Sequence, residues 1–515
     1  MNWFNYYGLI FIAIIMIPNI IFAIKNKNGY GNPYQNKAAQ ILEQISRYAC
    51  IVLMIFNIPY TWISFYFSFA EMVYIIVNSV FVLAYCVIWI VLWKKSGIGK
   101  ALLLSIIPSL IFLFSGIMIA SIPLSVFAVL FAVTHILISV KNAVSTETSG
   151  NIKRKSIVAS LSTILSFLVT VVCCFGGIAI YGQNSLSKLD SMSALDMINY
   201  DCSHKDNKIS IAIIDNGNIT YHIYGANGKE TTIYDYEIGS ISKTFVGLLC
   251  AKAVSEGKLK LADSISKYLD LDDTKYYPTI ERLLTHTSGY KAYYFEGSMI
   301  GNKFAQRTND FYGISQTQIL NKVKSVSLED KDYSFVYSNF GISVVGLVLE
   351  KIYGSNFTDI MNDFIRSELS LSNTQAAKQS GNLDQYWKWK ENDGYIPAGS
   401  IISNIQDMAD YLNMYLTDSL HYSSDTFAKI KQINANRPTY EKMNIRFDGI
   451  GMTWIWDDKN DIVWHNGGTT NFNSYMGFTK DRQKGVVILS NLSPDDKISM
   501  TVIGAKILTE NSSFY

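Results

Sequence analysis

Ser240 and Lys243 are the two side chains whose types and spacing most directly suggest covalent chemistry. They lie in the stretch Glu237-Ile-Gly-Ser-Ile-Ser-Lys-Thr-Phe, where an expected loop runs into an apolar helix that ends near Gly257. Positions three apart share a helix face, so the hydroxyl and the amine come within hydrogen-bond reach, as a nucleophile and its activator require. The start of a helix also offers unpaired N–H groups and a positive dipole end to an oxyanion. Ser-x-x-Lys is nevertheless common by chance, and the alternative interpretation is an N-cap serine followed by a solvent-facing lysine.

Composition and the remaining motifs exclude several other kinds of chemistry. No His-Glu-x-x-His sequence occurs, which excludes the usual zinc-protease signature. The spacing of the six cysteines suits neither zinc nor iron–sulfur ligation. The formal net charge is +2 and no basic stripe is present, which argues against a nucleic-acid partner. We therefore expect no metal, no organic cofactor and no nucleic acid.

The first third of the chain is dominated by apolar runs. Hydrophobic residues make up 49% of the 515 positions, and up to about Tyr181 they gather in runs close to the ~20 residues that a membrane-crossing helix needs. Six spans are expected: Tyr6–Ile24, Ala49–Phe69, Val73–Trp93, Ala101–Ala120, Leu124–Val140 and Ile157–Tyr181. The fourth and fifth are separated only by Ser121-Ile-Pro123. The sequence thus predicts an all-α membrane domain of about six transmembrane helices over residues 1–182.

Charge placement predicts how these spans cross the membrane. Lysine and arginine follow spans one, three and five, whereas the alternate connections hold almost no charge beyond Glu71. Because basic residues favour the cytoplasmic side, the N-terminus and everything after Tyr181 should lie on the outer face. We therefore expect a multi-pass cell-membrane protein in the lipid bilayer, with oligomerisation through the membrane domain as one role of the extra spans. His135, the only histidine in the spans, is expected to be a packing or interfacial residue.

The rest of the chain is typical of a globular domain. Residues 183–207 form a polar linker with a helical pattern near Met192–Ile198, and residues 208–515 form the domain. A turn sequence that favours positive φ, Asp215-Asn-Gly-Asn218, joins two alternating apolar runs into a hairpin. Further strands are expected at Gly451–Trp456, Ile462–His465, Ser474–Thr479 and Gly485–Leu489, with helices between and a last helix at Ile498–Leu508. This order predicts an α+β fold, in which one sheet is assembled from both ends of the domain and flanked by helices.

A set of short motifs carries a family resemblance. In chain order they are Ser240-Ile-Ser-Lys243, His286-Thr-Ser-Gly289, Tyr337-Ser-Asn339, Pro397-Ala-Gly-Ser-Ile-Ile-Ser403 followed by Asp407, and His465-Asn-Gly467-Gly468. In this order the set resembles the serine β-lactamase and penicillin-binding-protein superfamily, in its class C β-lactamase-like, D-alanyl-D-alanine carboxypeptidase and esterase branch. The resemblance covers about residues 205–510 and implies an antiparallel sheet flanked by helices. The six spans are not part of it.

The resemblance implies a role for each matching residue. Ser240 would form an acyl-enzyme, with Lys243 as its proton-handling partner. Tyr337 would act as general base, and Asn339 would contact the amide side of the substrate. A free phenol has a pKa of ~10, which a cationic neighbour would lower. His286 is a tempting second base, but in relatives its segment is structural.

His465 is where this chain departs from many relatives, which carry the lysine of a Lys-Thr-Gly strand at that place. The resemblance still implies a cation or donor opposite Ser240, with Gly467 and Gly468 lining the oxyanion site and the Gly468 N–H as its second donor. A histidine is partly neutral at pH 7, which weakens the binding of a substrate carboxylate. Efficient β-lactamase or strict carboxypeptidase activity is therefore less favoured than in relatives with the lysine.

The expected protein is a membrane-anchored extracytoplasmic serine hydrolase that acts on amide or ester bonds through an acyl-enzyme. Its expected partners are small peptide or ester substrates related to the cell wall, such as peptides that contain D-amino acids or D-alanyl esters, with β-lactams as further ligands. Three alternatives stay open: a penicillin-binding sensor that signals through the membrane domain, a peptidase that matures an exported peptide, and a catalytically inactive binding module. Intact Ser240, Lys243, Tyr337 and His465 argue against the last.

Overall fold

The structure is a computed structural model that describes residues 5–25, 34, 36–56, 70–93, 97–119, 121–145, 191–203, 206–305, 308–436, 438–494 and 498–509. The chain divides into two compact units, Met1–Ser185 and Leu186–Tyr515. Buried hydrophobic residues form one cluster in the first unit and two in the second. Each unit therefore has its own interior.

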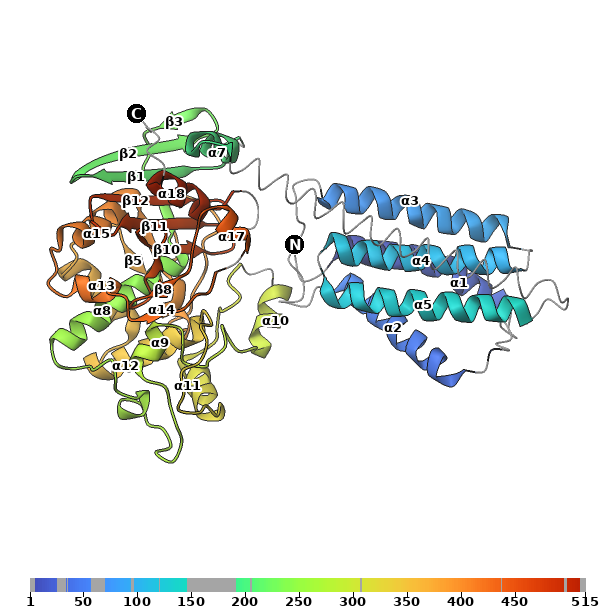
Figure 1. Ribbon diagram of the computed structural model, residues 1–515, viewed down its shortest axis with the longest axis horizontal. Helices are drawn as coiled ribbons and strands as arrows, with labels where there is room; N and C mark the ends of the chain where they lie inside the picture. The colour runs from blue at the N-terminus through green and yellow to red at the C-terminus, as the bar shows by residue number, and fades with distance from the viewer. Residues whose placement is uncertain are drawn as a thin grey trace. The chain divides into compact units, whose positions relative to one another are not determined.

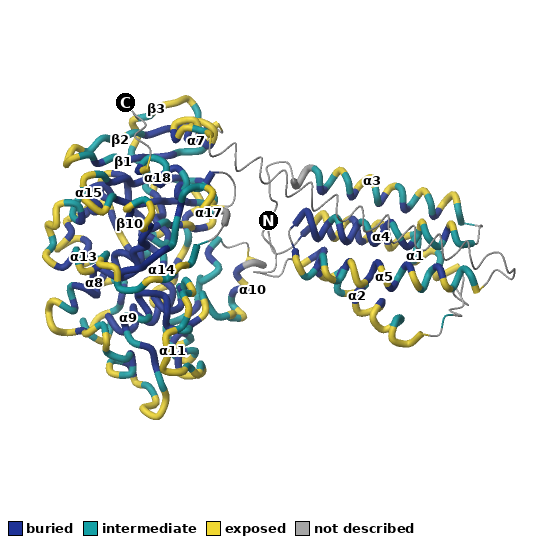
Figure 2. The backbone as a smooth tube through the Cα atoms, in the orientation of Figure 1, coloured by how far each residue is buried: buried dark blue, intermediate teal, exposed yellow. Residues whose placement is uncertain are grey.

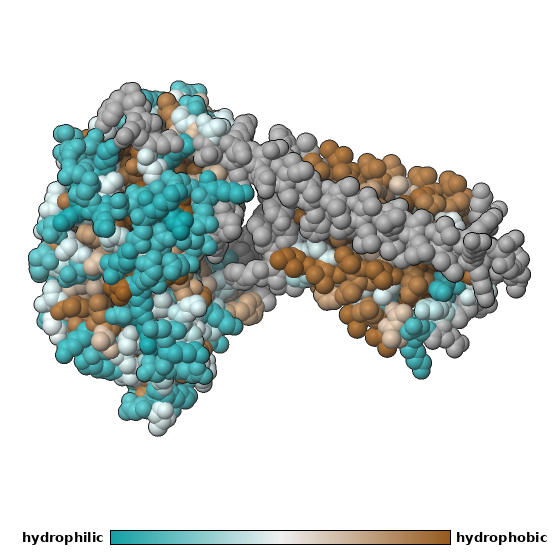
Figure 3. Space-filling model, in the orientation of Figure 1, coloured by the Kyte–Doolittle hydropathy of each residue, from teal (hydrophilic) through white to brown (hydrophobic). Residues whose placement is uncertain are grey.

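Long apolar helices make up the described part of the first unit (Figure 1). They are α1 (Tyr6–Lys25), α2 (Lys37–Ile55), α3 (Ala70–Val91), α4 (Ile98–Met118) and α5 (Ile122–Ser145). Within the described residues these five helices are long and apolar enough to cross a membrane. They expose many large hydrophobic side chains, which form the brown surface of this unit in Figure 3. Such a surface indicates membrane association.

The second helix differs from the span that the apolar run predicted. That run suggested Ala49–Phe69, whereas α2 begins at Lys37 with Asn36 as its N-cap. The earlier start escaped the prediction because polar residues interrupt the first turns of the helix. Residues 57–69 and the sixth expected span, Ile157–Tyr181, lie outside the described residues.

A buried polar contact joins α2 to α5. Glu43 is 4% exposed, and its Oε1 lies 2.8 Å from His135 Nδ1. The His135 ring also stacks on Phe131, with 4.6 Å between ring centroids. His135 is therefore a packing residue, as expected, and its partner is a carboxylate on a neighbouring helix.

One large antiparallel sheet forms the frame of the second unit. Among the described residues nine strands pair in the order β3-β2-β1-β12-β11-β10-β9-β8-β7. Their bounds are β1 (Ile209–Asp215), β2 (Asn218–Gly225), β3 (Gly228–Glu230), β7 (Lys431–Gln432), β8 (Gly449–Ile450), β9 (Ile455–Asp457), β10 (Ile462–Gly468), β11 (Asn473–Thr479) and β12 (Lys484–Ser490). β1 pairs with β12, so green and red strands lie side by side in Figure 1. The predicted α+β fold, with its sheet assembled from both ends of the domain, is confirmed.

Two turns of this sheet differ in how well the sequence predicted them. Asn216 and Gly217 have φ values of 49° and 80°, as the predicted two-residue hairpin turn requires. The single strand predicted at Gly451–Trp456 is wrong, because a tight turn with Thr453 at a φ of 74° separates β8 from β9. Trp454 is fully buried in that turn, which explains why its sequence resembles a strand.

Helices surround the sheet, and a small second sheet lies among them. The helices are α7 (Ala194–Asp201), α8 (Ser242–Ser255), α9 (Ile280–Leu284), α10 (Gly297–Phe304), α11 (Gln316–Ser325), α12 (Asn339–Tyr353), α13 (Phe357–Ser367), α14 (Ile396–Gly399), α15 (Ile405–Thr417), α16 (Ser423–Phe427), α17 (Pro438–Lys442) and α18 (Met500–Thr509), with 3-10 turns η1 (Gly239–Ile241) and η2 (Ile265–Lys267). The second sheet has the order β4-β6-β5, formed by β4 (Asp235–Glu237), β6 (Ile401–Asn404) and β5 (Gln375–Ala376). Buried residues, dark blue in Figure 2, follow β10 and its neighbouring strands.

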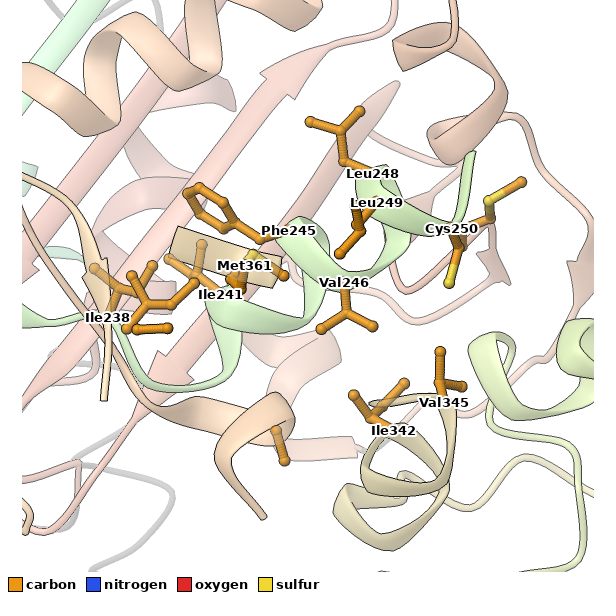
Figure 4. Packing of buried hydrophobic residues seen from close by; sticks show 14 of the residues in the cluster. Ile238, Ile241, Phe245, Val246, Leu248, Leu249, Cys250, Ile342, Val345 and Met361 are labelled. Atoms are coloured by element: carbon orange, nitrogen blue, oxygen red, sulfur yellow. The ribbon is translucent and has the colours of Figure 1, made fainter. Parts of the chain in front are cut away.

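α8 is a buried helix at the centre of the second unit. Every residue from Ser242 to Ala251 is buried. Figure 4 shows side chains of α8, among them Val246, beside Ile342 and Val345 of α12. A helix that is surrounded by apolar side chains is held firmly. Its first turn, which carries Lys243, is therefore fixed by the core.

Candidate active site

Ser240 lies on η1, between β4 and α8. β4 pairs with β6, and the contact continues as the Ile238 N–H donates to the Ile401 carbonyl. The chain then turns sharply, and α8 begins at Ser242. Ser240 is half-buried, and it is held between a strand and a buried helix. A nucleophile in this position is fixed yet accessible.

The end of β10 lies against the turn that carries Ser240. β9 pairs only with the first residues of β10, which leaves its later residues beside η1. Two glycines permit the approach. A Cβ on Gly239, whose φ is 50°, would lie 2.6 Å from the Gly468 nitrogen, and a Cβ on Gly467 would lie 2.0 Å from the carbonyl oxygen of the residue before Gly239. The backbones of Ser240 and Gly468 are thus adjacent, as a two-donor oxyanion site requires.

Lys243 is fully buried, with its amine beside the nucleophile. Nζ lies 2.8 Å from Ser240 Oγ and donates to the Ala398 carbonyl at 2.6 Å. Burial lowers the pKa of Lys243 well below its ordinary value, and among the described residues no carboxylate offsets this. Burial therefore favours the neutral amine, which can accept a proton from Ser240.

Tyr337 packs against the other functional side chains. Lys243 Nζ lies 5.0 Å from the centroid of its ring, and the rings of His286 and His465 lie 4.6 Å and 6.1 Å from it. Burial raises the pKa of Tyr337, and a hydrogen bond with Ser240 offsets this only in part. The lowered pKa expected from cationic neighbours does not occur, because burial is the largest effect on this phenol. The phenol keeps its proton at pH 7 and can donate it.

His465 is buried on β10 and carries no charge. Its Nδ1 lies 2.6 Å from the Asn466 carbonyl oxygen, so Nδ1 holds the proton and donates it there. Nε2 is then an acceptor, and it has no hydrogen-bond partner among the described residues. Burial and the nearby Lys243 lower the pKa of His465 to about 3. The cation or donor expected opposite Ser240 is therefore a neutral acceptor, which cannot attract a substrate carboxylate by charge.

His286 holds the backbone on both sides of Tyr337. Its carbonyl accepts the Val336 N–H at 2.9 Å, and its Nδ1 accepts the Ser338 N–H at 3.2 Å. Burial lowers the pKa of His286 well below its ordinary value, so the ring is neutral. Its φ of 56° is unusual for a residue with a side chain. These contacts give His286 a positioning role and explain why its segment is structural.

The remaining predicted residues lie around this centre. Asn339 is half-buried at the start of α12, two residues after Tyr337, and Gly468 is exposed at the end of β10. Sequence reasoning missed the carbonyl of Ala398 as a partner of Lys243, because a backbone group leaves no signal in residue types. It also gave no role to Glu237, although this buried carboxylate lies three residues before the nucleophile. Among the described residues no group of three His, Cys, Asp or Glu side chains could hold a metal.

Comparisons with known proteins agree with the fold. The family model for beta-lactamase matches residues 205–506, which is more than half of the chain. Protein flp of Staphylococcus aureus (strain MW2) is 23% identical over 311 residues, which are 56% of this chain and 60% of that protein. The chain thus matches less than two thirds of that relative's length.

Two solved structures share the fold at low identity. The octameric penicillin-binding protein homologue from Pyrococcus abyssi is 20% identical with a TM-score of 0.50, over 63% of this chain and 76% of that chain. The beta-lactamase/D-alanine carboxypeptidase from Yersinia pestis, complexed with citrate, is 19% identical with a TM-score of 0.50, over 63% of this chain and 97% of that chain. With the extent of the family match, these findings show that the chain belongs to the beta-lactamase family, a fold family of serine hydrolases, and that apolar helices precede its family domain.

Proposed function

We propose that this protein hydrolyses ester or amide bonds through an acyl-enzyme on Ser240. The observation that carries the proposal is the 2.8 Å distance between Ser240 Oγ and the buried Lys243 Nζ. A serine hydroxyl is a weak nucleophile until an adjacent base takes its proton. The neutral amine of Lys243 supplies that base.

Acylation begins as the Ser240 hydroxyl attacks the substrate carbonyl and its proton moves to Lys243 Nζ. The new negative charge on the carbonyl oxygen is stabilised by the backbone N–H groups of Ser240 and Gly468. Tyr337, protonated at neutral pH, then donates its proton to the leaving oxygen or nitrogen and recovers one from Lys243. The C–O or C–N bond breaks, and the acyl group stays on Ser240. Tyr337 thus relays a proton rather than starting as the general base that the resemblance implied.

Deacylation uses the same groups in the reverse direction. A water molecule attacks the acyl carbonyl as its proton passes to the Tyr337 and Lys243 pair. Ser240 leaves as the alcohol after it regains a proton from Lys243. The second product is the free acid, and the site returns to its starting protonation state.

The proposed substrates are esters and amides of peptides that contain D-amino acids, outside the cell. Support comes from the family membership and from the fold shared with a beta-lactamase/D-alanine carboxypeptidase. Because His465 is neutral and buried, we expect substrates without a free carboxylate beside the scissile bond to react best. The charge pattern of the connections supports an extracytoplasmic position for the domain.

The experiment compares full-length protein in detergent with its Ser240→Ala variant. The substrates are N-acylated D-alanyl-D-alanine, its C-terminal amide and ester, and a fluorescent penicillin. Wild type should hydrolyse the ester and the amide faster than the free acid, and Ser240→Ala should lose activity to the uncatalysed rate. Ser255→Ala is the matched control, because Ser255 is an exposed serine on the same helix.

The outcomes separate the alternatives. Equal hydrolysis by wild type and Ser240→Ala would refute the proposal. Stable penicillin labelling of Ser240 without turnover of any ester or amide would instead indicate a sensor. Faster hydrolysis of the free acid than of its amide would contradict the inference from His465.

A further inference from the structure

Glu237 is a buried carboxylate that contacts two separate segments of the site. It ends β4, three residues before Ser240, and is 5% exposed. Its Oε2 accepts the Thr469 hydroxyl at 2.6 Å, and its Oε1 accepts the backbone N–H of Trp387. One side chain therefore joins the strand before the nucleophile to two distant parts of the chain.

The two partners of Glu237 are linked through the segment that follows β10. Thr469 directly follows Gly468, whose N–H is the proposed second oxyanion donor. Trp387 belongs to the tryptophan segment (residues 385–389), and its Nε1 donates to Thr470 Oγ1 at 3.1 Å. The Thr469 hydrogen bond therefore ties the residue after Gly468 to the strand that precedes Ser240.

Among the residues that the structure describes, no basic side chain forms an ion pair with Glu237. In the same part of the structure, the ionisable groups near it are Lys388 and Tyr386, which flank Trp387, and Asp235 on its own strand. Asp235 itself pairs with Lys378. The β10 side contributes the uncharged Thr469 hydroxyl. Burial raises the pKa of Glu237 to about 7, although its two hydrogen bonds and Lys388 act in the opposite direction.

We propose that Glu237 is a positioning residue, whose ionised carboxylate holds the Gly468 end of β10 against the Ser240 turn. This inference rests on the proposed function. An ionised carboxylate accepts both hydrogen bonds strongly, whereas a protonated one has a donor of its own and loses strength as an acceptor. The oxyanion donor then shifts, and shifts of this kind slow the chemical step more than they weaken binding.

The test measures kcat and KM against pH for full-length wild type and for Glu237→Gln. Wild-type kcat should rise through an inflection near pH 7. Glu237→Gln should lose that inflection, with kcat at pH 8 reduced about tenfold or more and KM within about twofold, because the amide offers only one acceptor. The control is Glu350→Gln, since Glu350 is a half-buried carboxylate that likewise accepts two hydrogen bonds, from Phe357 N–H and Gln316 Nε2.

A second pair of variants keeps the carboxylate and changes its donor. Thr469→Val removes the hydroxyl that stabilises the ionised form, so the inflection should move to higher pH, and Thr469→Ser should restore it. An inflection that stays in Glu237→Gln, or that does not move in Thr469→Val, would overturn the inference while loss of activity in Ser240→Ala still supports the proposed function. Retained activity in Ser240→Ala would refute the proposed function itself.

Discussion

In water a lysine ammonium keeps its proton to a pH of about 10.4 and a phenol keeps its proton to about 10. At Lys243 burial moves the pKa down, and at Tyr337 burial moves it up. Both changes favour uncharged groups, because the charged forms lose their hydration. Burial therefore favours the uncharged amine at Lys243 and the uncharged phenol at Tyr337. In the proposed mechanism, this pairing makes Lys243 the acceptor of the Ser240 proton and Tyr337 the donor to the leaving group.

Replacing Lys243 with arginine tests the proton acceptor. A guanidinium keeps the hydrogen-bond donors of a lysine but is not deprotonated in proteins. We expect kcat/KM for an ester to fall by about 10²-fold or more, the usual contribution of a general base. Steady-state kinetics measures this, with the unfolding temperature recorded on the same samples. Lys252→Arg on the same helix is the control, since the Lys252 amine pairs with Glu256 and Glu368. If Lys243→Arg kept activity close to that of wild type, the account would be wrong.

The neutral histidines predict a loss of stability in acid. The pKa of His465 is about 3 in the folded protein, against an ordinary value of about 6.5. Below pH 6.5 the unfolded chain binds a proton that the folded protein does not, so stability falls as the pH drops from about 6.5 toward 3. His286 acts in the same direction. Glu237, with its raised pKa, acts in the opposite direction, since its contribution is lost as the pH rises through about 7.

The measurement is the unfolding temperature of full-length protein between pH 7 and pH 4.5. His465→Asn should lose less stability over this range than wild type, because its side chain binds no proton in either state. The same substitution at exposed His421 is the control. An identical slope for wild type and His465→Asn would show that the buried imidazole is not held neutral.

At the scale of elements, β10 and η1 form the site because two glycines let their backbones touch. The Cβ distances at Gly239 and Gly467 leave no room for any other residue without a shift of the backbone. The strand supplies one expected oxyanion donor and the turn supplies the nucleophile. In the proposed mechanism, their contact is therefore a condition for catalysis as well as for packing.

Gly239→Ala should separate these two effects. The added Cβ meets the Gly468 backbone at 2.6 Å, so β10 must move, and kcat/KM should fall by about 10²-fold. Gly257→Ala is the matched control, because Gly257 also has a positive φ, 69°, but an added Cβ there meets nothing within 4 Å. Both variants should lose the stability that a positive φ costs an alanine, but only Gly239→Ala should lose activity. Equal activity would contradict the role given to the contact.

Particular elements show how far the sequence could predict the structure. The turn at Asn216 and Gly217 follows from residue types, and a sheet assembled from both ends of the domain follows from the order of the expected strands and helices. The turn at Thr453 does not, because its apolar residues are buried like those of a strand. The members of the site follow from motif order, but their charge states depend on burial that only the packed structure determines. The neutral state of His465 is the main example.

At the scale of the whole molecule, the chain combines a hydrolase-family domain with a unit of apolar helices. Five of these helices are long enough to cross a membrane among the residues that the structure describes. The side on which the hydrolase domain lies depends on the number of crossings. The expected sixth span, Ile157–Tyr181, would place the domain outside.

Single cysteines can test this topology in intact cells. Lys459→Cys lies on an exposed turn of the hydrolase domain, and Ser145→Cys lies at the exposed end of α5. A membrane-impermeant maleimide should label Lys459→Cys in intact cells and Ser145→Cys only after permeabilisation. The parent protein, which carries only the natural cysteines, gives the background level of labelling. Labelling of Lys459→Cys only after permeabilisation would place the domain inside the cell and refute the proposal that its substrates are extracellular.

The central claim is that Ser240 carries the acyl group. Mass spectrometry of peptides from full-length protein, quenched in acid after brief incubation with an activated ester or a penicillin, tests it directly. The account predicts one acyl adduct on the peptide that contains Ser240, and no adduct there in Ser240→Ala. An adduct on another residue, or an adduct that persists on this peptide in Ser240→Ala, would contradict it.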